Sequence, residues 1–204
     1  MTAADSGPAS GPDLLQIAPT PPGPPRERAD AARNRRLLLA AAWRLFEQHG
    51  VDGLTMDAVA KAAGVGKGTV FRRFGDKSGL VSALLDERER ELQQGILSGP
   101  APLGPGASDT ERVQAFVGAY LDYLQTHLEL SRVSETVSPG ARYRIGAYWF
   151  WIKHLTILSA DAYDPEFRAH AVLALMDADL VHSLLARGWT WDRIRSGVET
   201  EISR

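Results

Sequence analysis

Apolar positions recur at helical spacing along most of the chain after residue 30. In residues 31–49 they stand at i, i+3, i+4, i+7 and i+8, and the set is Leu38, Ala41, Ala42, Leu45 and Phe46. One apolar stripe followed by Gly50 predicts an amphipathic helix that ends at this glycine. Because similar stripes follow in later segments, we expect an all-α fold.

Two short helices are predicted within residues 54–80, LTMDAVAKAAGVGKGTVFRRFGDKSGL. Thr55 can cap the first helix, because its hydroxyl can accept a hydrogen bond from an amide of the first turn. Gly64 suits the left-handed position that follows a helix. After a short turn, a second helix can run from Lys67 to Phe74.

The second helix presents one side for packing and another for contact. Val70 and Phe74 share one side, and at about 100° per residue Arg72 points the opposite way. A small, cationic, hydrogen-bonding face suits the major groove of DNA, where a guanidinium can pair with guanine. Lys77 lies in the first turn of the next helix, where its ammonium and nearby amides can hold a phosphate. The candidate DNA contacts are Arg36, Thr55, Lys67, Gly68, Thr69, Phe71, Arg72, Arg73 and Lys77.

The spaced motif of residues 34–86 resembles the tetracycline-repressor (TetR) family of bacterial transcriptional regulators. Its pieces are Ala40…Phe46…Gly50, Thr55…Val59-Ala60…Ala63-Gly64-Val65, Gly68-Thr69-Val70-Phe71…Phe74 and Asp76-Lys77…Leu80. The resemblance implies a homodimer that binds a palindromic operator in double-stranded DNA. It also implies that a small molecule in the C-terminal domain releases, or in some cases tightens, this grip.

One position departs from the family pattern. Such proteins usually have Tyr where this chain has Phe71, so a phosphate contact from a phenol is lost here. The Phe71 ring can instead stack on a sugar or touch a thymine methyl.

Two other interpretations of the motif are weaker. A phosphate-binding loop at residues 64–69 fails on spacing, because Lys61 stands where a glycine is needed and Gly68 where Ser or Thr should follow the lysine. A purely structural interpretation, with no DNA contact, has to treat all the coincident positions as chance.

Residues 1–30 are predicted to form a mobile tail, because they hold seven of the twelve prolines and few large apolar residues. An arginine-rich run, Arg26, Arg28, Arg33, Arg35 and Arg36, leads into the first helix. This run fits either an arm along the DNA backbone or minor groove, or a solvated arm with no DNA contact. We expect a helix-turn-helix domain over residues 31–86 and a helical ligand-binding and dimerisation domain over residues 87–204.

The charge distribution agrees with a DNA-binding head on an acidic body. The chain has a net charge of −2, but residues 26–80 hold 11 basic against 6 acidic side chains, which leaves −7 for the rest. The absence of cysteine excludes disulfides, thiolate metal sites and cysteine nucleophiles, and no signal peptide is recognisable. We therefore expect a cytoplasmic protein.

The C-terminal part predicts further helices. A helix over about 76–95 includes the charged run 86–91, which we interpret as a solvated face. After a Gly/Pro/Ser loop at 98–109, helices are expected at 109–127, 141–159, 165–187 and from Trp191 onward, and residues 131–138 favour at best a weak helix.

Residues 141–159 are the most aromatic stretch, and their rings fit either core packing or the wall of a ligand pocket. The uncharged run between Arg144 and Lys153 is too short to span a membrane. The candidate pocket residues are Tyr120, Tyr123, His127, Tyr148, Trp149, Trp151, His154 and Met176. The candidate dimer-interface residues, on the last two predicted helices, are Leu180, Leu184, Trp191, Ile194 and Val198.

These observations favour a homodimeric DNA-binding regulator, a repressor released by a small apolar ligand. We expect no cofactor and no metal, because His127, His154, His170 and His182 lack the close spacing of ligands. One rival is a helical module that binds a protein partner through its aromatic surface. A second is an enzyme that uses Asp177, Asp179 and His182 in the C-terminal domain.

Overall fold

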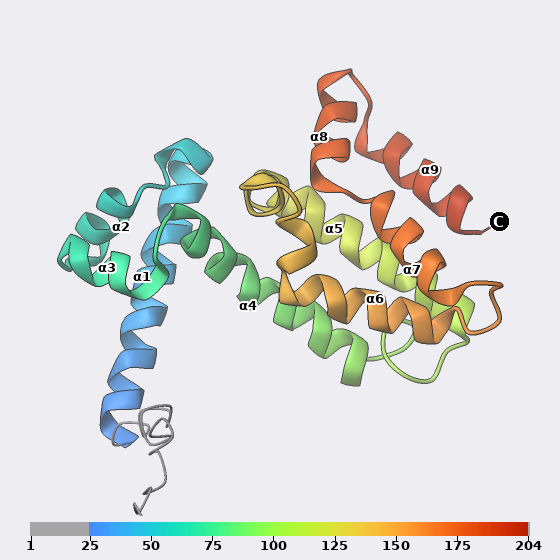
Figure 1. Cartoon of the computed structure of the whole chain (residues 1–204), viewed down its shortest axis with the longest axis horizontal. Coiled ribbons are helices and arrows are strands. Elements are labelled where there is room, and N and C mark those ends of the chain that lie inside the picture. Colours follow the sequence, from blue (N-terminus) through green and yellow to red (C-terminus); the bar gives the residue numbers. More distant parts are fainter. Residues whose placement is uncertain (1–24, 204) are drawn as a thin grey trace, which may run out of the picture.

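The computed structural model describes residues 25–203, and the predicted tail up to residue 24 lies outside the described residues. Within this range the chain forms α-helices and one short 3₁₀ helix, with no strand (Figure 1). The α-helices are α1 (Pro25–Gly53), α2 (Met56–Ala63), α3 (Lys67–Phe74), α4 (Lys77–Ser98), α5 (Asp109–Thr136), α6 (Gly146–Leu158), α7 (Pro165–Ala174), α8 (Ala178–Ala186) and α9 (Trp191–Ile202). The 3₁₀ helix is Arg142–Arg144.

The three N-terminal helices pack around a common core. Gly50 has a positive φ of 64°, which interrupts α1 at the predicted position and leaves one further turn up to Gly53. Leu38, Val59 and Val70 from the three helices are buried there. Helix α1 begins at Pro25, six residues earlier than the predicted start at residue 31.

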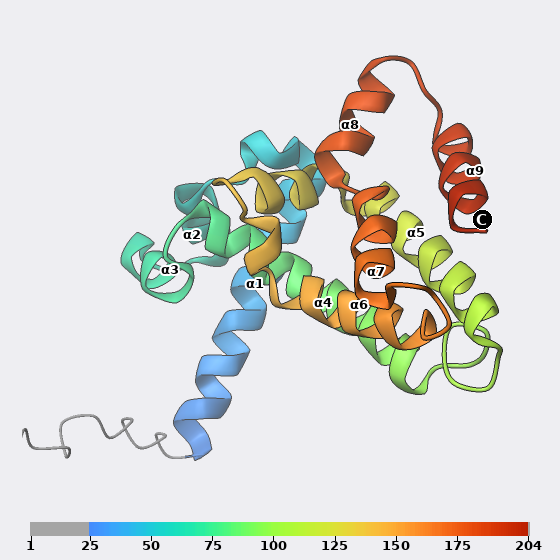
Figure 2. The same cartoon turned by 45° about the vertical axis from the view of Figure 1, so that its right-hand side comes forward.

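Helix α4 belongs to both halves of the molecule. Its first half contributes apolar side chains from Leu80 to Leu85 to the N-terminal core, and its last turns bring Ile96 into the C-terminal core. Figures 1 and 2 show α1–α3 on one side of this helix and α5–α9 on the other. A displacement of α4 would therefore move the two cores relative to each other.

The C-terminal core lies between α5, α6, α7 and α9, around the fully buried Phe116, Leu121 and Leu155. Helix α5 is longer than predicted: it bends at His127, where φ is −126°, and continues to Thr136. Residues 131–136 were expected to form at best a weak helix, and this was wrong. The sequence there is polar because the last turns of α5 face other polar groups in the interior.

The predicted long helix of residues 165–187 is divided into α7 and α8. Asp177 starts α8, since its carboxylate accepts a hydrogen bond from the amide of Leu180 at 2.9 Å. Pro165–Ala186 is the single described stretch that is long and apolar enough to cross a membrane, with a mean hydropathy of 1.3. A break in its middle, and packing of one side against α5 and α6, argue against a membrane span.

Candidate DNA-binding surface and C-terminal cavity

The turn between α2 and α3 holds α3 at a fixed angle. Thr55 caps α2 as predicted, accepting the Ala58 amide at 3.1 Å, and Gly64 takes the left-handed conformation with φ 67°. The amide of Val65 then donates back to the carbonyl of Ala60 at 3.0 Å. Val70 is fully buried beneath α3, so the opposite side of this helix faces outward.

The outward side of α3 carries most of the predicted DNA contacts. Lys67, Gly68, Phe71 and Arg72 are exposed, and Thr69 is half-buried. A Cβ at Gly68 would meet no atom within 4 Å, so packing inside the chain does not require glycine there. Because glycine has no side chain, nothing projects from α3 at this position, and the helix backbone can approach a DNA groove closely.

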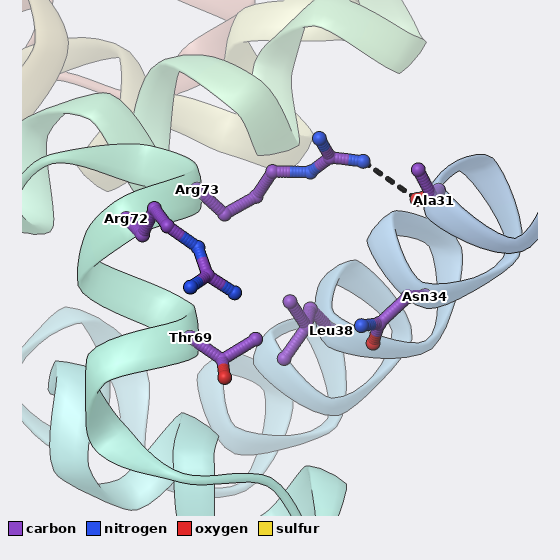
Figure 3. A pocket seen from close by; sticks show the side chains of 6 residues that line it. All are labelled: Ala31, Asn34, Leu38, Thr69, Arg72 and Arg73. Atoms are coloured by element: carbon purple, nitrogen blue, oxygen red, sulfur yellow. Dashed lines mark hydrogen bonds between the residues drawn. The ribbon is translucent and has the colours of Figure 1, made fainter. Parts of the chain in front are cut away.

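A hollow of about 190 Å³ separates α3 from the N-terminal part of α1 (Figure 3). It is lined by Ala31, Asn34, Leu38, Thr69, Arg72 and Arg73. Arg73 crosses this hollow and donates to the carbonyl of Ala31 at 2.6 Å, which fastens α1 to α3. Arg72 reaches into the same space, and within residues 25–203 it forms no hydrogen bond or ion pair. Arg72 is therefore free to contact a base.

Several other predicted contacts are engaged inside the protein. Lys67 pairs with Asp57 at 2.7 Å and lies 5.5 Å from the centre of the Phe71 ring. The ammonium of Lys77 donates to the carbonyl of Val51 at 2.6 Å, so this residue ties α4 to the last turn of α1. For Lys77 to contact a phosphate as predicted, its ammonium would have to share or give up the hydrogen bond to Val51.

The remaining predicted contacts differ in their surroundings. Arg36 is exposed on α1. The hydroxyl of Thr55 is occupied by its capping bond.

The aromatic helix α6 borders a small cavity between α4 and α5. The cavity has a volume of about 20 Å³, about the room that one water molecule needs. The predicted Tyr120, Tyr123, Tyr148 and Trp151 line it. Its other lining residues were not predicted, and they are Leu85, Glu89, Ser131, Ser134, Glu135, Arg142 and Ile145.

Half of the predicted pocket residues lie elsewhere. Trp149 is 51% exposed and donates to the carbonyl of Tyr143, and Met176 is fully buried in the core. His127 packs against Trp43 of α1 with ring centres 5.5 Å apart, where the two halves of the molecule meet. His154 packs against Phe116, and burial together with Arg112 lowers its pKa to about 4.

A buried ion pair forms one wall of the cavity. Arg142 donates to Glu135 at 2.5 Å, and both side chains are 8% exposed. Arg142 also donates to Asp177 at 3.2 Å and to the carbonyl of Leu173 at 2.8 Å. Glu135 in turn accepts the amide of Ala178 at 3.1 Å, so this group of charges holds the break between α7 and α8.

Glu89 has a different environment, because within the described chain it forms no salt bridge. Its nearest polar partner is the hydroxyl of Tyr123 at 3.5 Å, a weak hydrogen bond. Burial, and secondarily Asp86, raises the pKa of Glu89 to about 7. The prediction that residues 86–91 form a solvated face was therefore wrong at Glu89. A charged run gives no sign that one of its members turns inward.

The candidate interface residues separate into two groups. Ile194 and Val198 are 3% and 6% exposed and belong to the core of the chain itself, which contradicts their assignment to a surface between subunits. Leu180 is 42% exposed, and Leu184 and Trp191 are half-buried.

The residues of the rival enzyme interpretation have structural partners. Asp177 caps α8 and binds Arg142, and Asp179 pairs with Arg132 at 2.8 Å. His182 lies 3.7 Å from Glu129. Within residues 25–203, no group of three or more His, Asp or Glu side chains has the arrangement of a metal site.

Known proteins resemble the N-terminal part in sequence. The model of the family "Bacterial regulatory proteins, tetR family" matches residues 38–84. An HTH-type transcriptional regulator of Staphylococcus aureus is 43% identical over 53 residues, which are 26% of this chain. The chain thus covers 29% of the length of that relative.

Solved structures share the fold over most of the chain. A TetR-family transcriptional regulator from Pectobacterium atrosepticum has a TM-score of 0.66 at 20% identity, over 86% of this chain and 93% of that one. A transcriptional regulator from Saccharomonospora viridis has a TM-score of 0.62 at 21% identity, over 85% of this chain and 97% of that one. Residues 38–84 thus match the TetR family in sequence, and the chain as a whole shares the fold of solved TetR-family regulators.

Proposed function

We propose that this chain is a homodimeric, cytoplasmic transcriptional regulator, and not an enzyme, that binds a palindromic operator and represses until a small ligand releases it. The observation that carries the DNA-binding part is the exposed side of α3, where Arg72 has no partner within the described chain and Gly68 and Thr69 allow close approach. A guanidinium that has no partner in the protein, and that is flanked by small residues, can reach the major-groove edge of a guanine and donate hydrogen bonds to it.

Helix α4 supports a link between ligand and DNA. Leu85 packs in the N-terminal core and also lines the cavity, so one side chain touches both regions. A ligand that enlarges the cavity would displace α4 and, with it, α3. Such a ligand binds the DNA-free protein more tightly than the DNA-bound protein. It lowers the affinity for the operator by the same factor.

Relatives in fold support a small ligand in general. The Saccharomonospora viridis regulator was solved with choline, and the multidrug binding protein EbrR with imidazole. Our expectation of an apolar ligand fits poorly with a lining that includes Glu89, Glu135 and Arg142. A small ligand that also carries a polar or charged group fits this lining better.

Exposed apolar residues support self-association through α7 and α8. Phe167 is 70% and Leu180 is 42% exposed, and they border an open hollow of about 470 Å³ together with Ala171 and Ala174. Exposed apolar surface of this kind is typical of contact sites. We propose that Leu180 and Leu184 meet a second copy of the chain, and that Trp191 lies at the edge of this contact.

To test DNA binding, the purified full-length chain is used to select its preferred fragments from a pool of random DNA duplexes. Binding to the selected sequence is then measured by mobility-shift assay. We expect specific retardation that weakens as salt increases, since phosphate contacts release counterions. Lys153→Ala, which removes an exposed cation on α6, serves as the charge-matched control and should bind normally. A chain that selects no common sequence, or binds all duplexes equally at every salt concentration, contradicts the proposal.

Self-association is tested separately by sedimentation of Leu180→Glu. A charge buried in a subunit contact without a partner is strongly unfavourable, so this variant should sediment as a monomer and lose cooperative operator binding. An unchanged dimer would move the contact away from α8.

A further inference from the structure

The wall of the cavity between α4, α5 and α6 holds more carboxyl groups than cations. Glu135 is matched by Arg142, which also binds Asp177, so this one cation already serves two carboxylates. Glu89 adds a third carboxyl group with no salt bridge in the described chain. A buried carboxylate without a counterion is unfavourable, so the site is electrostatically incomplete.

A second polar group in the same wall is also incomplete. Ser131 is 3% exposed, lines the cavity, and its hydroxyl oxygen has no hydrogen bond of ordinary geometry to any described residue. Burial raises the pKa of the nearby Tyr123, and hydrogen bonding to Ser131 acts against that rise, so the Ser131 hydroxyl can donate to Tyr123 while its oxygen accepts no hydrogen bond from a described residue. Buried hydroxyls are normally paired, so this oxygen indicates a missing donor.

Aromatic rings enclose these two groups. Tyr120, Tyr123, Tyr148 and Trp151 all line the cavity, and Tyr120 and Trp151 meet edge to face with centres 6.2 Å apart. The faces of Trp and Tyr rings attract cations, especially where water is excluded. The walls therefore offer a positive ligand both a carboxyl group and aromatic rings.

We propose that the cavity takes an organic ammonium ion, whose charge lies against Glu89, whose N–H donates to Ser131, and whose carbon skeleton lies among the aromatic rings. This inference rests on the proposed function, since the ion would be the ligand that controls DNA binding. Arg142 does not oppose it, because its charge is already balanced by Glu135 and Asp177.

The route into the cavity is defined by two side chains. Arg142 and Tyr148 line both the cavity of about 20 Å³ and the open hollow of about 470 Å³ outside it. Tyr148 is held by His170 at 2.7 Å, and the Arg142 guanidinium lies 5.6 Å from the Tyr148 ring centre. If these two side chains turn aside, the cavity joins the end of the outer hollow next to His170, and the proposed subunit contact at Leu180 lies at another edge of that hollow, so an organic ion gains the room that the closed cavity lacks.

Binding should depend on pH in a defined direction. The charged groups that act on Glu89 are Asp86, Glu135 and Arg90, and Tyr123 is its hydrogen-bond partner. Its pKa of about 7 means that ionised Glu89 becomes abundant as the pH rises through neutrality. An ammonium ion requires the ionised form, so its affinity should increase from about pH 6 to about pH 8 and its binding should release a proton.

The experiment compares three probes of one shape: benzylammonium, which is positive, benzyl alcohol, which is neutral, and benzoate, which is negative. Calorimetry and tryptophan emission are measured on the full-length protein, with Trp151 in the cavity wall as a reporter. We expect benzylammonium to bind about tenfold or more tightly than benzyl alcohol, as a charge-assisted hydrogen bond implies, and benzoate not to bind.

Two variants assign the effect to the cavity. Glu89→Gln keeps the shape and should remove both the preference for the cation and the pH dependence. Ser131→Ala should weaken benzylammonium several-fold without changing benzyl alcohol. The matched control is Glu91→Gln on the same helix, where Glu91 is exposed and pairs with Arg88 at 2.9 Å. This control should behave like the unmodified protein.

The inference is overturned if benzylammonium causes no response at millimolar concentration, if benzyl alcohol or benzoate binds as well, or if Glu89→Gln keeps the preference. Mobility shifts without any probe, on the same preparation, separate this failure from failure of the proposed function. A protein that binds its operator but shows no preference for the cation remains a regulator with a different ligand. A protein that binds benzylammonium but no operator has lost the proposed function, and not the cation site.

Discussion

The DNA-binding surface and the C-terminal cavity each contain a charged group with no salt bridge in the described chain, Arg72 and Glu89, and these two are opposite in sign and differ in exposure. Arg72 is exposed on α3, where water solvates the guanidinium, and in the proposed complex DNA would replace that water. Glu89 is half-buried on α4 in the wall of the cavity, where burial raises its pKa. An exposed unpaired charge is stabilised by water, so it has little free-energy cost in the absence of a partner. A buried charge lacks this solvation and is neutralised by a proton or by a ligand of opposite charge.

The two regions also differ in how the chain supports them. The α3 surface depends on local features: a cap, a glycine in the left-handed region and one buried valine. The cavity depends on contacts between distant parts of the sequence, from Glu89 to Asp177. We therefore expect substitutions to affect stability more in the cavity and DNA binding more at α3.

The largest effect on stability should come from Arg142→Met. This change leaves Glu135 buried without its cation, which costs about 3–5 kcal/mol in comparable cases. Denaturant unfolding followed by circular dichroism measures the free energy of unfolding. Hydrogen exchange should show faster opening at α7 and α8 than at α2 and α3.

The double variant Arg142→Met with Glu135→Gln provides the control for this prediction. It removes the stranded charge and should recover much of the lost stability. If the single variant is as stable as the unmodified chain, the ion pair does not hold the break between α7 and α8.

The same contrast explains what could be predicted from the sequence. Helices α2 and α3 have the predicted bounds, because Thr55, Gly64 and Gly66 are local signals that act within a few residues. The break at Asp177 was missed, since apolar residues continue at helical spacing on both sides of it. Glu89, Ser131 and Glu135 were missed because polar residues predict solvent exposure, and here they face one another inside the fold.

The next largest effect should be on DNA binding, in Arg72→Ala. If Arg72 contacts a base edge, its loss should cost about 1–3 kcal/mol per half-site and relax the base preference at one position. Affinity for the selected operator and for single-base variants of it is measured by mobility shift. Thermal stability should not change, since Arg72 has no partner within residues 25–203. Equal loss on every sequence would make Arg72 a phosphate contact.

A smaller effect is expected from the titration of Glu89. Its pKa is raised from 4.5 to about 7 in the folded protein, so the folded state holds this proton more tightly than the unfolded chain does. The resulting stabilisation is fully present below about pH 4.5 and is lost as the pH rises through about 7, an effect of about 1–3 kcal/mol. Glu89→Gln should flatten this part of the pH dependence of unfolding. An identical slope in both proteins would mean that Glu89 is not buried as described.

The smallest effect compares the caps of two helices, one in each region. Thr55 caps α2, which has eight residues, through the Ala58 amide, and Ser108 caps α5, which has 28 residues, in a reciprocal bond with Glu111. Replacing either by alanine should cost about 1 kcal/mol in unfolding free energy. The consequence for DNA binding should differ, because α2 positions α3 and the start of α5 does not. Thr55→Ala should therefore weaken operator binding, Thr55→Ser should restore it, and Ser108→Ala should leave it unchanged. If Ser108→Ala weakens operator binding as much as Thr55→Ala at equal stability, the two regions are coupled more tightly than their separate cores indicate, and α4 transmits even small changes at the far end of the C-terminal domain to α3.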